Sequence, residues 1–404
     1  MRSWPSLVRR CFSTYKHHAP RLEPKKGDRV VVAMSGGVDS SVVAKLLSEK
    51  DYALTAVFMR NWDTRDESGT DHGCEWEKDW EDVQLVCHKL DIPCKMVDLS
   101  RQYWTRVFEP CLDMWRKGYT PNPDIWCNKE VKFGGLVDQL ADGDYWLATG
   151  HYANKAWVAH RSLISESAGG TPVLRPTLIR PKDRTKDQTY YLSAISEQSL
   201  ARTIFPLAPF SKREVRELAR KAGLPTAARQ ESMGICFVGE KRRFNDFLAQ
   251  YITPNPGSVV DLETNRTVGR HQGLWQYTIG QNARISGLDR KAYVARKDLE
   301  HNIVYVVPGS DHPALYFKGL VASGFQWIWH DSVPSALNTD NAFHCRVKFG
   351  YRTPDVACTV RRGAEEDALR LTFAEPQKHV APGQVAVVLD GDRVLGCGTI
   401  MEPL

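Results

Sequence analysis

The stretch Arg29-Val30-Val31-Val32-Ala33-Met34-Ser35-Gly36-Gly37-Val38-Asp39-Ser40 decides the fold of this chain. It begins with a β-branched run of the kind buried in a parallel sheet, and Ser41-Val42-Val43-Ala44-Lys45-Leu46-Leu47 follows with helical periodicity. Gly36 and Gly37 are therefore expected between the carboxyl end of a strand and the amino end of a helix. Because they lack Cβ atoms, backbone N–H groups can converge there on an anion, and the helix dipole adds a partial positive charge. The preferred guest of such a turn is a phosphate chain.

The hexapeptide of residues 35–40 lacks the lysine of an ordinary nucleotide-binding loop, which indicates that ATP is split at its α-phosphate. Two glycines alone would be compatible with a plain βα turn. Here Ser35, Asp39 and Ser40 accompany them and favour a nucleotide site. The hexapeptide resembles the signature of the PP-loop ATP pyrophosphatases, a family that adenylates a substrate and releases pyrophosphate.

Length and composition indicate a soluble protein of several domains. The chain has 404 residues, 42% of them hydrophobic and 25% charged, and the length predicts two or three domains. No apolar run reaches the roughly 18 residues that a transmembrane helix needs, so no membrane role is expected. The net charge is +6, but residues 1–26 hold seven of the 54 basic residues and one of the 48 acidic ones. The remainder of the chain therefore has no net charge.

The excess of basic residues lies in an N-terminal leader, and its composition predicts a targeting sequence rather than an RNA-binding surface. Residues 1–26 are rich in arginine and serine, and Trp4, Leu7, Val8 and Phe12 would gather on one side of a helix. This composition is typical of a mitochondrial presequence and predicts a location in the mitochondrial matrix. The alternative is a disordered basic tail that contacts RNA. Any RNA contact by the rest of the chain must come from local basic patches.

Strand-like and helical segments alternate after the leader, which predicts an α/β, doubly wound parallel sheet of Rossmann-like type. The expected strands are 30–33, 53–59, 94–99 and 146–149. The glycine loop, residues 59–61 and residues 149–152 follow the carboxyl ends of such strands, where ligands bind. Ser211-Lys212-Arg213-Glu214 is a capping box that begins a helix, and Gly223-Leu224-Pro225 ends it. We therefore expect a catalytic domain over residues 27–225.

Two further domains are expected after residue 225. Residues 226–314 are rich in glycine and aromatic residues and predict a small mixed domain. From residue 315 onward the pattern alternates, with a hairpin turn at Asp390-Gly391-Asp392, and predicts a C-terminal antiparallel β-barrel over residues 315–404.

Asp124 and Cys127 form a candidate chemical pair. None of the ten cysteines belongs to a C-x-x-C motif, so no local zinc or iron–sulfur motif is predicted. Pro121 and Pro123 favour an extended approach, after which Asp124 and Cys127 would lie three residues apart on one side of a helix or turn. The carboxylate can accept a proton, and Lys129 and Lys132 would favour the thiolate. From these residues alone, a structural buried cysteine is equally compatible.

Cys236 lies between Gly234 and Gly239 and is followed by Lys241-Arg242-Arg243. The glycines indicate a mobile or tightly turned loop, which suits a thiol that receives and delivers a group. A cysteine in an ordinary loop is equally compatible.

The three segments, in this order, resemble the tRNA-specific 2-thiouridylases, in the version found in mitochondria. The resemblance extends from about Arg29 to the C-terminus. It includes the segments 58–62 (Phe-Met-Arg-Asn-Trp), 148–152 (Ala-Thr-Gly-His-Tyr), 186–188 (Lys-Asp-Gln), 205–207 (Phe-Pro-Leu), 277–281 (Tyr-Thr-Ile-Gly-Gln) and 382–384 (Pro-Gly-Gln).

This resemblance implies a set of site residues. Those implied to bind ATP, with Mg²⁺, are Ala33, Met34, Ser35, Gly36, Gly37, Val38, Asp39, Ser40, Met59 and Gly150. Asp124 is implied to be the acid/base, Cys127 the nucleophile and Cys236 the carrier of a persulfide sulfur. Those implied to contact tRNA are Asn122, Pro123, Asp124, His151, Lys186, Asp187, Gln188, Tyr351 and Gln384, with the central domain also binding tRNA.

The implied reaction replaces the C2 oxygen of the wobble uridine, position 34, with sulfur. Because that oxygen is a poor leaving group, it is first adenylated by ATP; the Cys236 persulfide then supplies sulfur and Cys127 resolves it by forming a disulfide. The implied tRNAs read lysine, glutamate and glutamine codons, and the sulfur comes from a donor protein and ultimately from a cysteine desulfurase.

Two departures from the family pattern concern Gly350, where a basic residue is common, and Met233, which replaces a small hydroxyl residue. The first weakens the inferred contact at Tyr351. Two alternatives remain at this point. One is another PP-loop synthetase of amidotransferase type, which would not need the two cysteines, and the other is a catalytically silent tRNA-binding protein.

Overall fold

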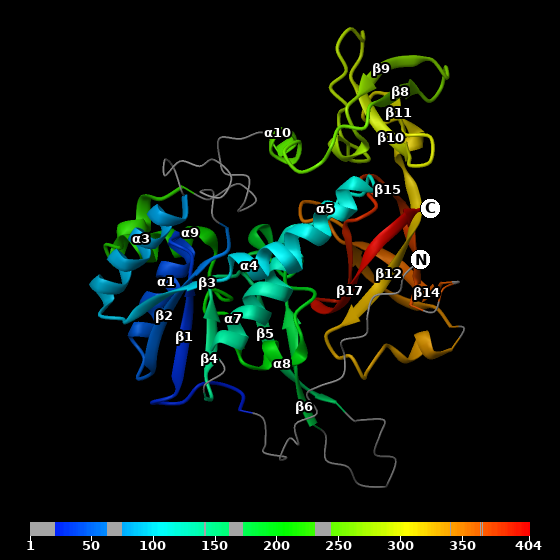
Figure 1. The fold of residues 1–404 in the computed structure, drawn as a ribbon. Helices are drawn as coiled ribbons and strands as arrows, with labels where there is room; N and C mark the ends of the chain where they lie inside the picture. Colours follow the sequence, from blue (N-terminus) through cyan, green and yellow to red (C-terminus); the bar gives the residue numbers. More distant parts are fainter. Residues whose placement is uncertain are drawn as a thin grey trace.

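The computed structural model describes residues 21–62, 75–140, 143–160, 173–230, 244–339, 341–363, 365 and 367–404. Most of the predicted leader, and the segment that contains Met233 and Cys236, lie outside these residues. The described chain forms three units: an α/β domain, a small sheet domain and a β-barrel (Figure 1). No helix in the described ranges is long and apolar enough to cross a membrane.

The first unit is built on a five-stranded parallel sheet with the strand order β3-β2-β1-β4-β7. The strands are β1 Arg29–Met34, β2 Ala53–Arg60, β3 Cys94–Asp98, β4 Trp146–Thr149 and β7 Thr203–Ile204. The first four agree with the sequence prediction, whereas the short β7 was not predicted. Val31 of β1 is aligned with Thr55 of β2 and Leu147 of β4, so β1 is the central strand.

Helices cover both faces of this sheet, as its hydrophobic pattern requires. Val30, Val32 and Met34 of β1 belong to one core cluster and Val31 belongs to another, because successive side chains of a strand point to opposite faces. The first face is covered by α1 Val38–Ser48, α3 Glu75–Leu90 and α9 Lys212–Lys221. The second is covered by α4 Ser100–Tyr103, α5 Glu109–Arg116, α6 Pro123–Trp126, α7 Leu136–Gln139 and the π-helices Trp104–Phe108 and Cys127–Gly135. The doubly wound prediction is confirmed.

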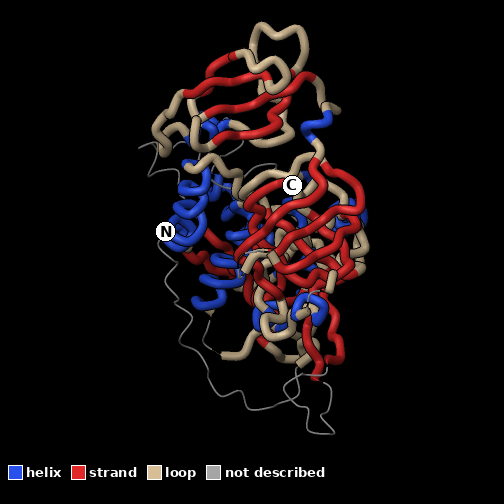
Figure 2. The backbone as a smooth tube through the Cα atoms, turned by 90° about the vertical axis from the view of Figure 1, so that its right-hand side faces the viewer, coloured by secondary structure: helices blue, strands red, loops and turns tan. Residues whose placement is uncertain are grey.

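The central unit has a mixed sheet with the order β10-β11-β8-β9. Its strands are β8 Gly257–Asp261, β9 Thr267–His271, β10 Ala292–Asp298 and β11 Ile303–Pro308, with β8 and β11 parallel. It lies above the rest of the molecule, at the end of α5 (Figures 1 and 2). The short helix α10 Phe244–Leu248 precedes it, and Phe244 and Phe247 pack on the aromatic residues of the first unit.

The C-terminal unit is a closed antiparallel barrel of six strands, as predicted. Its strands are β12 Phe317–Trp327, β13 Phe343–Lys348, β14 Val356–Arg362, β15 Leu369–Gln377, β16 Val385–Asp390 and β17 Arg393–Pro403, and β12–β17 pairing closes it. The hairpin of β5 Asn154–His160 and β6 Val173–Ile179 extends the same sheet, because β6 pairs with β17 at Arg393 and Val394. This junction between the first and third units was not predicted. The last α-helix of the described residues to be placed, α8 Glu197–Ala201, packs against β6.

Candidate active site

The glycine loop follows the carboxyl end of β1, which has β2 on one side and β4 on the other. Because β2 and β3 follow on one side of β1 and β4 is added on the other side, the carboxyl end of β1 is the topological switch point of the sheet, where ligands bind. Gly36 has a φ of +72°, and a Cβ there would lie 2.7 Å from the backbone oxygen of Asp79. A Cβ at Gly150, after β4, would lie 3.0 Å from the backbone nitrogen of Ser40. Both glycines are thus required by close backbone approaches around the loop.

The loop holds its shape through its own serines. Ser40 Oγ accepts a hydrogen bond of 3.2 Å from the backbone N–H of Ser35, and Ser41 Oγ donates to the Gly37 carbonyl at 2.8 Å. Gly37 is the N-cap of α1, and no side chain caps the helix there. The first-turn N–H groups of α1 are therefore left for a bound anion, which is the arrangement expected of a phosphate site.

Asp39 is paired with a residue that sequence reasoning did not assign to the site. Its carboxylate accepts hydrogen bonds from Lys212 Nζ at 2.8 and 2.7 Å and from the Tyr152 hydroxyl at 2.9 Å. Lys212 is the first residue of α9, whose capping box was predicted, but the 173 positions between Lys212 and Asp39 gave no signal of this pair.

Arg229 fixes the loop from a second side. Its guanidinium donates to the Gly36 carbonyl at 2.9 Å and forms ion pairs with Asp79 and Asp82 of α3. Arg229 is seven positions before Cys236, and its role was also missed by sequence reasoning. The described chain on this side of Cys236 is therefore joined directly to the glycine loop.

The end of β2 links the glycine loop to Cys127. Met59, predicted to bind ATP, is half-buried near the end of β2, and Ala33 is half-buried near the end of β1. Two residues after Met59, the Asn61 amide nitrogen lies 4.0 Å from Cys127 Sγ. Cys127 is 4% exposed. Among the described residues, the Oδ1 atoms of Asn61, which contacts this thiol, and of Asn128, the next residue in the chain, are buried without a hydrogen-bond partner.

Asp124 lies on the wall of a cavity of about 310 Å³ where all three units meet. The residues that line it are Trp115, Thr120, Pro121, Asn122, Pro123, Asp124, Phe244, Asn245, Trp275, Gln276, Thr278, Gln281 and Gln384. Many of them carry amide or hydroxyl groups that can donate or accept hydrogen bonds, as recognition of a base edge requires. The structure thus brings Asn122, Pro123, Asp124 and Gln384, four of the residues predicted to contact tRNA, together in a cavity that is large enough for one nucleobase.

Burial controls the electrostatics around Asp124. It raises the pKa of the Asp124 carboxyl, and the Lys132 ammonium opposes this rise. Burial and the nearby Asp124 also raise the pKa of the Cys111 thiol, which keeps that cysteine protonated and unreactive. A carboxyl group with a raised pKa exchanges protons closer to neutral pH, which suits an acid/base.

Asp124 and Cys127 are one helical turn apart, but Cys127 does not line the same cavity. Asp124 lies in the first turn of α6, and Cys127 begins the following π-helix. On the far side of the segment that contains Cys236, Phe244 and Asn245 line the Asp124 cavity. Before the segment that contains Cys236, Arg229 thus contacts the glycine loop, and after it, Phe244 and Asn245 line the Asp124 cavity.

Two of the residues predicted to contact tRNA have internal partners. Asp187 is 6% exposed, and its carboxylate pairs with Arg180 and accepts hydrogen bonds from Thr189. The Gln188 side chain accepts a hydrogen bond of 2.9 Å from the Tyr152 backbone N–H. Both side chains therefore shape the segment from within.

His151 and Lys186 are half-buried. His151 Nδ1 lies 2.6 Å from Thr149 Oγ1, and burial together with the nearby Lys132 holds its pKa well below the ordinary value. His151 is therefore neutral at physiological pH and offers a hydrogen bond rather than a charge to a partner.

Gln384 and Tyr351 of the barrel unit also contact the first unit. Gln384 Nε2 donates to the Thr120 carbonyl at 2.8 Å, and the Thr120 N–H donates to the Pro382 carbonyl at 2.8 Å. Tyr351 packs against Tyr191 with the ring centroids 4.7 Å apart. These contacts attach the barrel to the segment that leads into Asp124.

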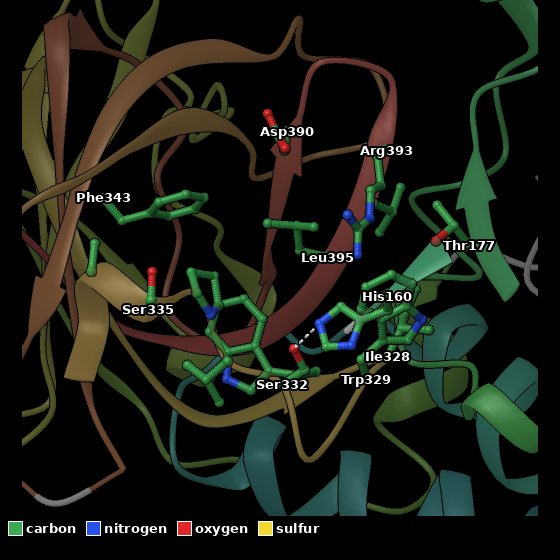
Figure 3. A pocket seen from close by; sticks show the side chains of 15 residues that line it. His160, Thr177, Ile328, Trp329, Ser332, Ser335, Phe343, Asp390, Arg393 and Leu395 are labelled. Atoms are coloured by element: carbon green, nitrogen blue, oxygen red, sulfur yellow. Dashed lines mark hydrogen bonds between the residues drawn. The ribbon is translucent and has the colours of Figure 1, made fainter. Parts of the chain in front are cut away.

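A second cavity, of about 410 Å³, lies between the β5–β6 hairpin and the barrel (Figure 3). His160, Trp329 and Arg393 line it, and Ser332 Oγ lies 2.9 Å from His160 Nε2. It shares no lining residue with the Asp124 cavity.

Beside this second cavity, Glu197, His330 and Asp331 could bring three ligand atoms together. Arg175, however, bonds Glu197 at 2.7 Å and Asp331 at 2.6 Å, which makes the group an ion-pair cluster.

Known proteins match almost the whole chain. Three family models match consecutive parts: the tRNA methyl transferase HUP domain over residues 28–240, the tRNA methyl transferase PRC-barrel domain over residues 245–308 and the aminomethyltransferase beta-barrel domain over residues 317–400. The tRNA-specific 2-thiouridylase MnmA of Halalkalibacterium halodurans is 43% identical over 94% of this chain and 96% of its own length. That of Staphylococcus aureus strain JH9 is 42% identical over 93% and 95%.

A solved structure of a 4-thiouridine synthetase–RNA complex with bound ATP matches more weakly. It is 16% identical, covers 56% of this chain and 50% of the matched one, and has a TM-score of 0.29. A likeness of this strength supports no further conclusion.

Proposed function

Because this chain belongs to the tRNA-specific 2-thiouridylases of the PP-loop superfamily, we propose that it adenylates C2 of the wobble uridine of mitochondrial tRNAs and then inserts sulfur from a persulfide on Cys236. The chain is a tRNA sulfurtransferase. The descriptions of two family models name a tRNA methyl transferase. The full-length relatives, which match more than nine-tenths of the chain, are named 2-thiouridylases, and we therefore follow their activity. The proposed products are 2-thiouridine, AMP and pyrophosphate.

One observation carries the proposal: Asp124 lies in a base-sized cavity, one helical turn from Cys127, and Cys127 contacts Asn61, which follows β2, the neighbour of β1. The target uracil would occupy the cavity with its C2 carbonyl toward Asp124. The ATP α-phosphate would then be attacked by the uracil oxygen. The bond between the α-phosphorus and the bridging oxygen breaks, and its electron pair leaves with pyrophosphate.

The residues of the loop fit an ATP site on their own geometry. The first-turn N–H groups of α1 would bind a phosphate, and Asp39, whose carboxylate pairs with Lys212 in the structure, would hold Mg²⁺. Bound Mg²⁺ would neutralise phosphate charge. Gly36 and Gly150 permit the close backbone packing that gives this loop its shape.

Sulfur transfer needs two thiols. In one route, the terminal sulfur of the Cys236 persulfide attacks C2 and displaces AMP. Cys127 then attacks Cys236 Sγ and breaks the sulfur–sulfur bond. The electron pair of that bond remains on the new thiocarbonyl sulfur. In the other route, Cys127 attacks first and hydrosulfide is released to attack C2. Both routes oxidise Cys127 and Cys236 to a disulfide, which a thiol reductant must open before the next turnover. The described ends around Cys236, at the glycine loop and the Asp124 cavity, support this meeting of the two thiols.

The proposed function is tested by loss of the protein and by exchange of label. In cells that lack it, mass spectrometry of mitochondrial tRNAs for lysine, glutamate and glutamine should find uridine in place of 2-thiouridine at position 34. The purified protein should exchange labelled pyrophosphate into ATP only when tRNA is present. An unchanged amount of 2-thiouridine in those cells would overturn the proposed substrate. Pyrophosphate exchange at the same rate with and without tRNA would overturn the proposed order of steps.

The location and the sulfur supply belong to the same proposal. Residues 1–26, with seven basic residues and one acidic residue, support import into the mitochondrial matrix. A fluorescent protein fused to residues 1–26 should enter mitochondria, and one that stays cytosolic would contradict this. We further expect a persulfide-carrying donor protein, supplied by a cysteine desulfurase, to load Cys236.

A further inference from the structure

We propose that Lys212 is the phosphate-binding lysine of this site, which binds the β- and γ-phosphates of ATP and the pyrophosphate that leaves. The proposal rests on the proposed function, because it assigns a residue to the same ATP site. Residues 35–40 contain no lysine, although many phosphate-binding loops use one to neutralise the β- and γ-phosphates. The fold supplies an ammonium group at this place from a distant helix.

The position of Lys212 is defined by several contacts. Its Nζ lies 2.8 and 2.7 Å from the two Asp39 oxygens and 5.8 Å from the centre of the Tyr152 ring. The side chain is 13% exposed, and that of Asp39 is 30% exposed. The ammonium is thus held in the first turn of α1, at the end of the helix where phosphate binding is expected.

The start of α9 fixes the backbone from which this side chain extends. Glu214 accepts a hydrogen bond of 2.6 Å from the Ser211 N–H, and Ser211 Oγ accepts one of 3.3 Å from the Glu214 N–H. The Lys212 N–H donates to Asp183 at 2.9 Å. With its backbone held on both sides, Lys212 directs a long side chain into the ATP site at little further cost in entropy.

Electrostatics explains why a cation is needed there. Asp39 is useful as a ligand for Mg²⁺, but as an unpaired carboxylate it would repel the phosphates. In the structure Lys212 neutralises this carboxylate. With ATP bound, the Lys212 ammonium would pair with the phosphate oxygens, and Asp39 would be free to hold Mg²⁺, which would supply the neutralising charge. As the bond to the α-phosphorus breaks, negative charge grows on pyrophosphate, which a nearby ammonium stabilises.

The test compares ATP with AMP, because only ATP carries the phosphates assigned to Lys212. We expect Lys212→Met to weaken the binding of ATP and of inorganic pyrophosphate by roughly tenfold to hundredfold, and that of AMP by less than about threefold. The matched control is Lys182→Met, because Lys182 pairs with Glu214 of the same helix but is 58% exposed and lies outside the site. It should bind all three molecules as the wild-type protein does.

Equal weakening of ATP and AMP binding, or no weakening of ATP binding, would overturn the assignment. If Lys212→Met does not fold, the wild-type protein decides instead: ATP and pyrophosphate, but not AMP, should protect Lys212 from reductive methylation, measured by mass spectrometry. Equal protection by AMP would overturn the assignment. None of these measurements needs tRNA, so they test the role of Lys212 independently of the proposed function. A wild-type protein without tRNA-dependent pyrophosphate exchange would overturn the proposed function, but not the assignment of Lys212.

Discussion

The rings of Tyr191 and Tyr351 lie with their centroids 4.7 Å apart and their planes inclined by 31°, and they join the first unit to the barrel beside the active site. The Tyr191 carbonyl accepts a hydrogen bond of 3.0 Å from Asn128, the neighbour of Cys127. Burial, together with the nearby Asp124 and Tyr351, raises the pKa of Tyr191 and keeps its hydroxyl protonated. The ring that holds the barrel in place thus belongs to a residue whose carbonyl also binds Asn128, the neighbour of Cys127.

Replacing Tyr351 tests whether this ring contact positions the barrel for tRNA. Tyr351→Ala should raise the KM for tRNA and lower the free energy of unfolding by about 0.5–1.5 kcal/mol beyond the loss of buried area, with the Kd for ATP unchanged. Tyr351→Phe keeps the ring and should behave as the wild-type protein. Steady-state kinetics and urea unfolding measure both effects. If Tyr351→Phe changes the KM for tRNA and the free energy of unfolding as much as Tyr351→Ala does, the effect comes from the hydroxyl group and not from the ring contact.

Local sequence predicted what local interactions determine. The β-branched run of β1 and the capping box at Ser211 each specify an element through neighbouring residues, and both formed as expected. The pair of Lys212 with Asp39 was not predictable, since it depends on how α9 packs against α1. The same holds for the pairing of β6 with β17, which involves only Arg393 and Val394 of the barrel strand.

The tRNA-contact predictions show the same limit. A polar residue quoted for its type alone does not reveal whether it faces solvent or the interior. Asp187 lies buried against Arg180, whereas Gln384 bonds the Thr120 carbonyl and also lines the Asp124 cavity. Tertiary packing decides both orientations, and contact of these residues with tRNA stays a prediction.

Asp124→Asn tests the acid/base role through its pH dependence. Burial raises the pKa of Asp124, so the ionised form needed for proton acceptance should be lost, as the pH falls, at a higher pH than for an ordinary aspartate. Thiolation by the wild-type protein should show this acid limb, and Asp124→Asn should lower kcat roughly 10²–10⁴-fold. The pH profile of 2-thiouridine formation measures both. A variant that retains wild-type kcat would show that Asp124 is not the acid/base.

The same substitution has an opposite effect on stability. A raised pKa in the folded state means that the unfolded chain releases this proton first, so Asp124 contributes most at low pH and costs stability as the pH rises through its folded pKa. Asp124→Asn removes this cost. The melting temperature of the variant, relative to that of the wild-type protein, should therefore increase as the pH rises above the ordinary aspartate pKa of 3.8. A difference that does not change with pH would show that the pKa of Asp124 is not raised in the folded protein.

Gly36→Ala tests whether ATP binding depends on the shape of the loop. An added Cβ would lie 2.7 Å from the Asp79 backbone oxygen and 3.0 Å from Arg229, so the loop must move. Because misplacement by about 1 Å can cost roughly 10²-fold, we expect ATP-dependent pyrophosphate exchange to fall by about that factor. Gly391→Ala is the matched control, since Gly391 also has a positive φ, of +56°, but a Cβ there would meet open space. Comparable losses in both variants would point to general backbone strain.

The two-thiol route is tested by replacing each cysteine. Cys127→Ser and Cys236→Ser should each reduce 2-thiouridine formation to background, because a disulfide requires both thiols, while the Kd for tRNA changes little. Cys345→Ser is the control: Cys345 and Cys358 lie opposite each other on β13 and β14 with their sulfur atoms 3.4 Å apart, and are another pair able to form a disulfide. That variant should thiolate tRNA normally. After a single turnover without reductant, peptide mapping of the wild-type protein should find Cys127 joined to Cys236, and thiolation by either serine variant would exclude this route.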